Sequence, residues 1–86
     1  MQFDYSPRFE KQWVKVLKKI KTRALERLDL LLVDEFNPQL GNHKLVGILA
    51  PFRSIDVTGD WRILYCKMSD EIILLYAIGT HSQLYN

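Results

Sequence analysis

Three short runs of β-branched, aliphatic and aromatic residues follow one another in the second half of the chain, at residues 53–57, 61–67 and 71–78. Gly, Asp and Ser residues separate them, and apolar runs divided by such turn formers are typical of a strand meander. Gly59 lies in the first turn, where we expect it to supply the positive φ that a tight hairpin usually needs. The pattern therefore predicts three strands joined by short turns.

The first half of the chain carries a different periodicity. Residues 2–5 alternate polar with aromatic side chains and predict a short first strand. Ser6 and Pro7 then predict a helix start, because a serine cap accepts a backbone N–H and proline at the first helical position loses only an unpaired donor. Apolar residues follow at helical spacing, on the face expected to enter the core: Phe9, Trp13, Val16, Leu17 and Ile20.

A second helix is expected to begin at a Thr22 cap and to end at Asn37, because the residue before Pro38 avoids the α region. So little sequence separates the two helices that they must form an antiparallel hairpin or one bent helix. The expected apolar stripe of the second helix consists of Leu25, Leu28, Leu31, Leu32 and Phe36.

The polar loop at residues 39–45 joins the helices to the meander. Leu40 and Leu45 are expected to anchor it, which leaves His43 and Lys44 free to face solvent or a ligand. The order is one strand, a helical hairpin and three strands (β-α-α-β-β-β), with a short C-terminal tail. This order predicts an α+β fold with the helices on one face of a mostly antiparallel sheet, whose other face is solvent-exposed or functional.

Composition narrows the class of protein. With 86 residues, the chain is expected to form a single domain, residues 1–86, around one modest core. A hydrophobic share of 48% fits a soluble globular protein, and no apolar run approaches the roughly 20 residues of a membrane span. No signal peptide is visible, and Cys66 is the only cysteine, expected as a buried reduced thiol. We therefore expect a cytoplasmic protein without a membrane partner.

The formal charge of +2 conceals a strong asymmetry. Residues 8–27 carry eight basic side chains against two glutamates, a net charge of +6. This basic stripe is either a solvated helix face or an electrostatic footprint for nucleic acid, and the stripe alone leaves both interpretations open. Its basic members are Arg8, Lys11, Lys15, Lys18, Lys19, Lys21, Arg23 and Arg27.

Polar side chains also stand at turns and strand ends of the predicted sheet, where rigid scaffolds usually present reactive groups. Several chemistries do not fit them. There is no phosphate-binding glycine loop and no cysteine pair for zinc. The two histidines share no tight metal motif with Asp56 or Asp60, and Ser54 and Ser82 lack a nucleophile-elbow context. We therefore expect no metal and no cofactor.

What remains suits metal-independent RNA cleavage. This reaction needs a base for the 2′-OH proton, an acid for the 5′-leaving oxygen and positive charge at the phosphate. Histidine suits either proton-transfer role, and Arg62 can fork onto phosphate oxygens. Trp61 or Tyr85 can stack on an extruded base.

Purely structural roles are open for the same side chains. His81 can cap the last turn, and Asp60 can be only a turn residue. Arg62 can pair with Asp56 across the hairpin, and Arg53 can pair with a helix carboxylate. The catalytic hypothesis therefore rests on the joint placement of these residues.

Five motifs occur in order along nearly the whole chain: Tyr5-Ser6-Pro7-x-Phe9, His43-x-Leu45-x-Gly47, Arg53, Gly59-Asp60-Trp61-Arg62-x-x-Tyr65 and Gly79-Thr80-His81-Ser82-x-x-Tyr85. In order and spacing they resemble the RelE/ParE toxin superfamily, and the closing motif is most similar to its YafQ branch. The resemblance implies the toxin of a type II toxin–antitoxin pair, an endoribonuclease that enters the ribosomal A site and cleaves mRNA. It also implies a cognate antitoxin, with operator DNA contacted only through that antitoxin.

The resemblance transfers residue by residue. His43, Asp60, Trp61 and His81 match positions of the YafQ-type active site, Tyr85 stands at its terminal aromatic position, and Arg62 matches a phosphate-contacting arginine of the RelE branch. We expect a catalytic set of His43, Asp60, Arg62 and His81, and a substrate-binding set of Lys44, Arg53, Asp56, Trp61 and Tyr85. Within it, His81 is expected as the general acid, and His43 or Asp60 as the base.

Two positions depart from the YafQ pattern. Asp56 stands where that branch has a second catalytic histidine, and Ala77 where it has an arginine. The losses leave room for weak activity or an altered codon preference. Three functions therefore stay open: a ribosome-dependent endoribonuclease, a non-enzymatic ParE-like toxin that binds gyrase, and an inactivated relative that acts through antitoxin binding.

Overall fold

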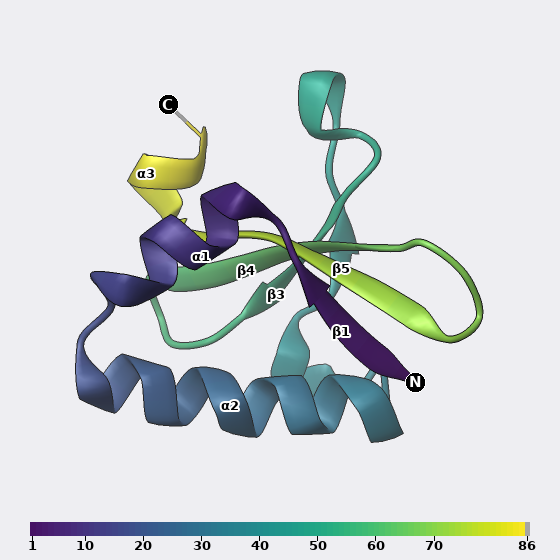
Figure 1. Cartoon of the computed structure of the whole chain (residues 1–86), viewed down its shortest axis with the longest axis horizontal. Helices are drawn as coiled ribbons and strands as arrows, with labels where there is room; N and C mark the ends of the chain where they lie inside the picture. The colour runs from purple at the N-terminus through teal and green to yellow at the C-terminus, as the bar shows by residue number, and fades with distance from the viewer. Residues whose placement is uncertain (86) are drawn as a thin grey trace.

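The computed structural model describes residues 1–85 and contains a five-stranded sheet in the order β1-β5-β4-β3-β2 (Figure 1). Strand β1 pairs with β5 in parallel, and all other pairs are antiparallel. The elements are β1 Gln2–Tyr5, α1 Pro7–Val14, α2 Lys18–Val33, β2 His43–Lys44, β3 Arg53–Asp56, β4 Trp61–Lys67, β5 Ile72–Thr80 and α3 His81–Tyr85, with 3-10 turns at Pro38–Leu40 and Gly47–Leu49. The expected α+β fold is confirmed, and the sheet gains a short edge strand, β2, within the loop.

The start of α1 follows the prediction. The Ser6 hydroxyl accepts a hydrogen bond from the Phe9 N–H at 3.0 Å, and Pro7 is the first helical residue. The same hydroxyl donates to the Tyr76 carbonyl at 2.6 Å. The Ser6 hydroxyl therefore both caps α1 and links this helix to strand β5.

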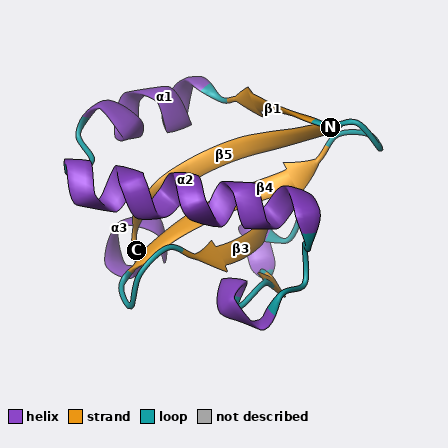
Figure 2. Cartoon of the chain, turned by 90° about the horizontal axis from the view of Figure 1, so that it is seen from below, coloured by secondary structure: helices purple, strands orange, loops and turns teal. Residues whose placement is uncertain are grey.

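The boundary between the helices was predicted wrongly. Helix α1 ends at Val14, and α2 already begins at Lys18, so Thr22 lies inside α2 and donates its hydroxyl to the Lys18 carbonyl at 3.2 Å. The Val16 N–H bonds the Trp13 carbonyl at 3.1 Å, a tight i to i−3 bond that closes the helix and lets the chain reverse. The result is the expected hairpin, with α2 running back along α1 (Figure 2).

The apolar stripe of α2 also differs from the expectation, although Leu28 and Leu31 are buried as predicted. Leu25 and Phe36 are 54% and 63% exposed, and Phe36 lies beyond the helix end at Val33. Leucines stand on several sides of this helix, so its hydrophobic period is ambiguous in the sequence. The packing against the sheet selects instead the face of Ile20, Ala24, Leu28 and Leu31.

The two faces of the sheet carry separate apolar clusters. The main core lies between the helical hairpin and the sheet and includes Phe9, Ile55, Ile63 and Leu75. A smaller cluster on the opposite face joins Leu64, Ala77 and Leu84, with Leu45 and Phe52 packed against it. Figure 1 shows α3 and the 3-10 turn Gly47–Leu49 projecting from the side of the sheet opposite to α2. The second face is therefore only partly open.

Gly59 does not adopt the positive φ that was expected in the β3–β4 turn. Positive φ occurs at Gly41 (54°) and Gly47 (67°), and not at Gly59. The β3–β4 turn is closed by Thr58 instead, whose hydroxyl oxygen accepts the Trp61 N–H at 3.2 Å.

Cys66 is half-buried rather than fully buried, and this burial raises the pKa of its thiol. No helix in residues 1–85 is long and apolar enough to cross a membrane.

Candidate functional site

A cavity of about 430 Å³ opens on the α3 side of the sheet. Five of the nine predicted site residues line it: His43, Asp56, Arg62, His81 and Tyr85. They come from four elements, β2, β3, β4 and α3. Gly41 and Leu45 complete the lining.

The strand order explains why these side chains meet. His43 stands opposite Ser54 across β2 and β3, and Asp56 stands opposite Arg62 across β3 and β4. Trp61 pairs with Thr80, so the start of α3 at His81 is held beside the β3–β4 turn. The His81 N–H donates to the Asp60 carbonyl at 3.0 Å. Residues up to 42 positions apart in sequence therefore converge at one end of the sheet.

Arg62 is the cation of the cavity, and its guanidinium is already heavily engaged. Nε lies 3.0 Å from Asp56 Oδ1, which confirms the cross-hairpin ion pair raised as an alternative. Nη1 donates to the Thr58 carbonyl at 2.9 Å and to the Trp61 carbonyl at 3.0 Å, and Nη2 donates to the Gly59 carbonyl at 3.1 Å. The turn carbonyls therefore fix the guanidinium at the rim of the cavity.

One of the two histidines lies in a strand and the other in a helix. His43 is exposed on the edge strand β2, and its Nδ1 lies 3.0 Å from the Gly41 carbonyl. If Nδ1 carries the proton, it donates to that carbonyl and leaves Nε2 as an acceptor. His81 begins α3 and packs against the Tyr85 ring, with 4.6 Å between ring centroids. The Tyr85 hydroxyl is buried and finds no hydrogen-bond partner within residues 1–85.

Gly79 serves close packing rather than a bend in the chain. Strand β5 continues through it to Thr80, and the residue is buried. A Cβ atom at this position would lie 3.0 Å from Gln83 Oε1 and 3.3 Å from Leu84 Cδ2. Gly79 therefore allows α3 to pack closely on the sheet, which is what brings His81 to the cavity.

The other four predicted residues lie outside the cavity lining. Trp61 precedes Arg62 in β4 and faces the main core, because neighbouring strand residues point to opposite faces. Asp60 is exposed in the turn, and Lys44 is exposed in β2. Arg53 lies on the helix side, where its Nε donates to Asn42 Oδ1 at 2.7 Å and its guanidinium covers the Phe36 ring at 5.2 Å.

A polar cluster next to strand β2 was not predicted from the sequence. Asn42 donates to the Tyr65 hydroxyl at 2.6 Å and to the Glu35 carbonyl at 3.0 Å. The Tyr65 hydroxyl donates to Glu35 Oε2 at 2.7 Å, and Lys67 pairs with the other carboxylate oxygen at 2.6 Å. The available signal was Tyr65 itself, since a tyrosine inside a buried strand needs a partner for its hydroxyl.

Electrostatics in this cluster favour the ionised glutamate. Burial, together with the nearby Glu35 carboxylate, raises the pKa of Tyr65 to about 12. The hydrogen bond from Asn42 acts in the opposite direction and lowers this pKa. Burial alone would raise the pKa of Glu35, but the hydrogen bonds from Lys67 and Tyr65 and the Lys67 and Arg53 charges lower it. The cluster therefore links Asn42, the residue before His43, to Tyr65 in strand β4.

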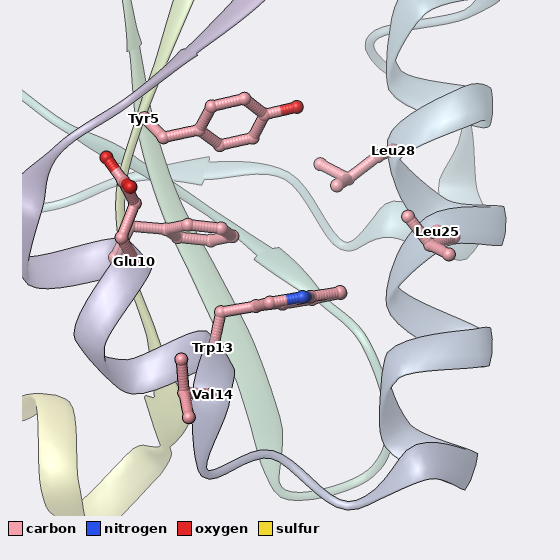
Figure 3. A pocket seen from close by; sticks show the side chains of 7 residues that line it. Tyr5, Glu10, Trp13, Val14, Leu25 and Leu28 are labelled. Atoms are coloured by element: carbon pink, nitrogen blue, oxygen red, sulfur yellow. The ribbon is translucent and has the colours of Figure 1, made fainter.

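A second hollow lies between α1 and α2 and has a volume of about 460 Å³ (Figure 3). Its lining is mainly aromatic and aliphatic, including Tyr5, Trp13 and Leu25. Among residues 1–85, Glu10 and Tyr5 are the ionisable side chains that line it, and no histidine or arginine there could transfer a proton or bind a phosphate. The cavity beside α3 is therefore the candidate catalytic site.

The basic stripe runs over the helical hairpin. Lys11, Lys15, Lys18 and Lys19 are exposed, whereas Lys21 is half-buried with its ammonium 5.6 Å from the Trp13 ring centroid. Residues 1–85 contain no group of three or more His, Cys, Asp or Glu side chains placed to hold a metal ion.

Comparison with known proteins adds a family assignment. The family model described as "Bacterial toxin of type II toxin-antitoxin system, YafQ" matches residues 1–86. Among proteins with curated descriptions, no sequence matches this chain.

Three solved structures illustrate the likeness in fold. YafQ from E. coli strain BL21(DE3) has a TM-score of 0.81 at 22% identity, over 99% of this chain and 98% of that chain. The E. coli DinJ-YafQ toxin-antitoxin complex gives 0.77 at 24%, over 99% and 97%. A YoeB/ParE toxin from Agrobacterium tumefaciens gives 0.80 at 13%, over 94% and 99%. At these identities the structures support the fold.

Proposed function

This chain belongs to the YafQ family of bacterial type II toxins, and on that premise we propose that it is a ribosome-dependent endoribonuclease that cleaves mRNA in the cytoplasm. The observation that carries the proposal is the convergence of two imidazoles and a guanidinium on one cavity, His43, His81 and Arg62. Metal-independent RNA cleavage requires these three functions, a base, an acid and a cation.

The reaction is an attack of the ribose 2′-oxygen on the adjacent phosphorus, which displaces the 5′-oxygen of the next nucleotide. His43, as the base, accepts the 2′-OH proton, and His81, as the acid, donates a proton to the leaving oxygen. Arg62 stabilises the negative charge that builds on the phosphate oxygens. Of the two candidate bases, His43 is favoured because it lines the cavity with His81, whereas Asp60 is exposed in the turn outside it.

The sharpest test of this mechanism is His81→Ala. Loss of one proton-transfer group usually reduces the rate about a hundred- to ten-thousand-fold. The variant should stay folded, because the hydrogen bond from residue 81 to the Asp60 carbonyl is made by the backbone and, among residues 1–85, only the exposed ring contact with Tyr85 is lost. Single-turnover mRNA cleavage on programmed ribosomes is the measurement, with exposed Ser82→Ala in the same helix as the matched control. Cleavage by folded His81→Ala at the wild-type rate would show that the histidine is structural.

The alternatives make different predictions. A ParE-like toxin that binds gyrase needs no proton-transfer pair, and an inactivated relative would only bind its antitoxin. Primer extension during expression detects mRNA cleavage and separates the first function from both others. A gyrase supercoiling assay then separates the two non-enzymatic functions.

We further propose that a cognate antitoxin covers the cavity with a helix or an added strand. In the solved DinJ-YafQ and YoeB-YefM toxin-antitoxin complexes, one chain has this fold. Purification from the native operon should bring down a small acidic partner. Recovery of the chain alone, without toxicity at native levels, would contradict the proposal.

The basic stripe is proposed to meet ribosomal RNA. Reversing the charge of the exposed Lys11, Lys15, Lys18 and Lys19 should weaken ribosome association and flatten its dependence on salt. Co-sedimentation at several salt concentrations measures both effects. An unchanged salt slope in a folded charge-reversed protein would leave the stripe as a solvated face.

A further inference from the structure

Asp56 occupies the place where an anionic ligand would approach Arg62. Its Oδ1 lies 3.0 Å from Nε of Arg62, and its other oxygen lies against Gly41. Gly41 has a φ of 54°, and a Cβ atom there would collide with the Asp56 carboxylate. Because Gly41 has no side chain, it leaves space for the Asp56 carboxylate.

The remaining donors of Arg62 are few. A guanidinium has five N–H groups. Three of them donate to the carbonyl oxygens of Thr58, Gly59 and Trp61, and Nε faces Asp56. Carboxylate and phosphate oxygens recognise the same guanidinium fork, so a phosphate can form a bidentate pair with Arg62 only by displacing Asp56.

The charge of the cavity leads to the same conclusion. Its ionisable lining groups are His43, Asp56, Arg62, His81 and Tyr85. Within residues 1–85, the Asp56 carboxylate offsets the positive charge of the Arg62 guanidinium with which it pairs. The Arg62–Asp56 pair therefore offers little net attraction for an RNA phosphate. The Asp56 side chain is 42% exposed and can rotate toward solvent when another ligand takes its place.

We propose that Asp56 is a built-in competitor for the phosphate at Arg62, and that it sets a low affinity of the free protein for its substrate. The inference rests on the proposed function in taking an RNA phosphodiester as the ligand. Capture of RNA by the cavity alone is then weak, and cleavage requires that the phosphate be delivered and held by contacts made elsewhere. Asp56 thereby helps to restrict cleavage to RNA presented by a partner.

The test uses Asp56→Asn, which removes the charge and keeps the shape and one acceptor oxygen. Binding of inorganic phosphate to the free protein is followed by NMR, from the Arg62 Nε–H signal and the His81 ring signals. We expect affinity to rise about tenfold, the size of one close charge interaction in a solvated cavity. The matched control is Asp70→Asn, which makes the same charge change in the exposed β4–β5 turn.

A double-mutant cycle separates competition for Arg62 from general charge. In an Arg62→Gln background, Asp56→Asn should improve phosphate binding much less, because the contested group is gone. Equal affinity of Asp56→Asn and wild type, an equal gain in Asp70→Asn, or an undiminished gain without Arg62 would each overturn the inference. If Asp56→Asn fails to fold, Asp56→Ser undergoes the same comparison.

The inference and the proposed function fail separately. Phosphate binding is measured without ribosomes. Tighter binding by Asp56→Asn together with no mRNA cleavage by wild type on ribosomes would refute the nuclease and leave the competition intact. Cleavage by wild type together with unchanged phosphate binding in Asp56→Asn would refute the competition alone.

Discussion

Replacing Tyr65 by Phe should destabilise the protein without disturbing its apolar packing. The Tyr65 side chain is fully buried, and its hydroxyl joins Asn42 and Glu35. The substitution keeps the ring and removes only the oxygen. It therefore isolates the contribution of the polar cluster that holds the His43 strand.

The magnitude follows from the bonds that are lost. The hydroxyl donates to the Glu35 carboxylate at 2.7 Å, and a hydrogen bond to a charged group contributes about 1.5–3 kcal/mol. Asn42 loses the acceptor of one N–H at 2.6 Å but keeps the Glu35 carbonyl at 3.0 Å, which adds about 1 kcal/mol. We expect the free energy of unfolding to fall by about 2.5–4 kcal/mol, a large share of the roughly 5–15 kcal/mol typical of a domain.

Urea unfolding measures this change as a lower midpoint at an unchanged m value. The matched control is Tyr76→Phe, because within residues 1–85 the Tyr76 hydroxyl makes only an exposed contact, with Arg8 Nη1 at 3.4 Å. The control should change the free energy of unfolding by no more than about 0.5 kcal/mol. If Tyr65→Phe costs no more than Tyr76→Phe, the cluster does not stabilise the fold and the reasoning is refuted.

Three further predictions concern single positions. The pKa of Glu35 is lowered on folding from its ordinary value of 4.5, so its contribution to stability is present above that value and is lost as pH falls through the lower folded value. Urea midpoints should show Glu35→Gln less stable than wild type at pH 7, with a gap that narrows as pH falls below 4.5. Gly79→Ala should push α3 away from the sheet, lowering the free energy of unfolding by about 1–3 kcal/mol and reducing mRNA cleavage. Gly41→Ala, with its positive φ and its collision with Asp56, should lower the unfolding temperature, whereas Gly59→Ala, with open space around it, should leave that temperature unchanged or higher; equal effects of the two would contradict the strain argument.

Local patterns in the sequence determined most of the elements. Strand β1, the Ser6 cap of α1 and the three strands of the meander follow from alternation, capping and turn chemistry, which act between near neighbours. The end of α1 and the start of α2 did not follow, because the chain reversal depends on i to i−3 bonds that no residue type announces. The buried face of α2 was ambiguous for a similar reason, since only contact with the sheet chooses among its leucines.

The sequence also determined which residue types could carry acid–base chemistry at a phosphate: two histidines and Arg62 near predicted strand ends and loops. Only the tertiary structure decided which of the candidates share one cavity. Pairing of Asp56 with Arg62, and of Trp61 with Thr80, brings His81 to the cavity and turns Trp61 into the core on the other face. Side-chain direction in a sheet alternates with every residue, so register and pairing between distant strands, which no local pattern encodes, determine the composition of the site.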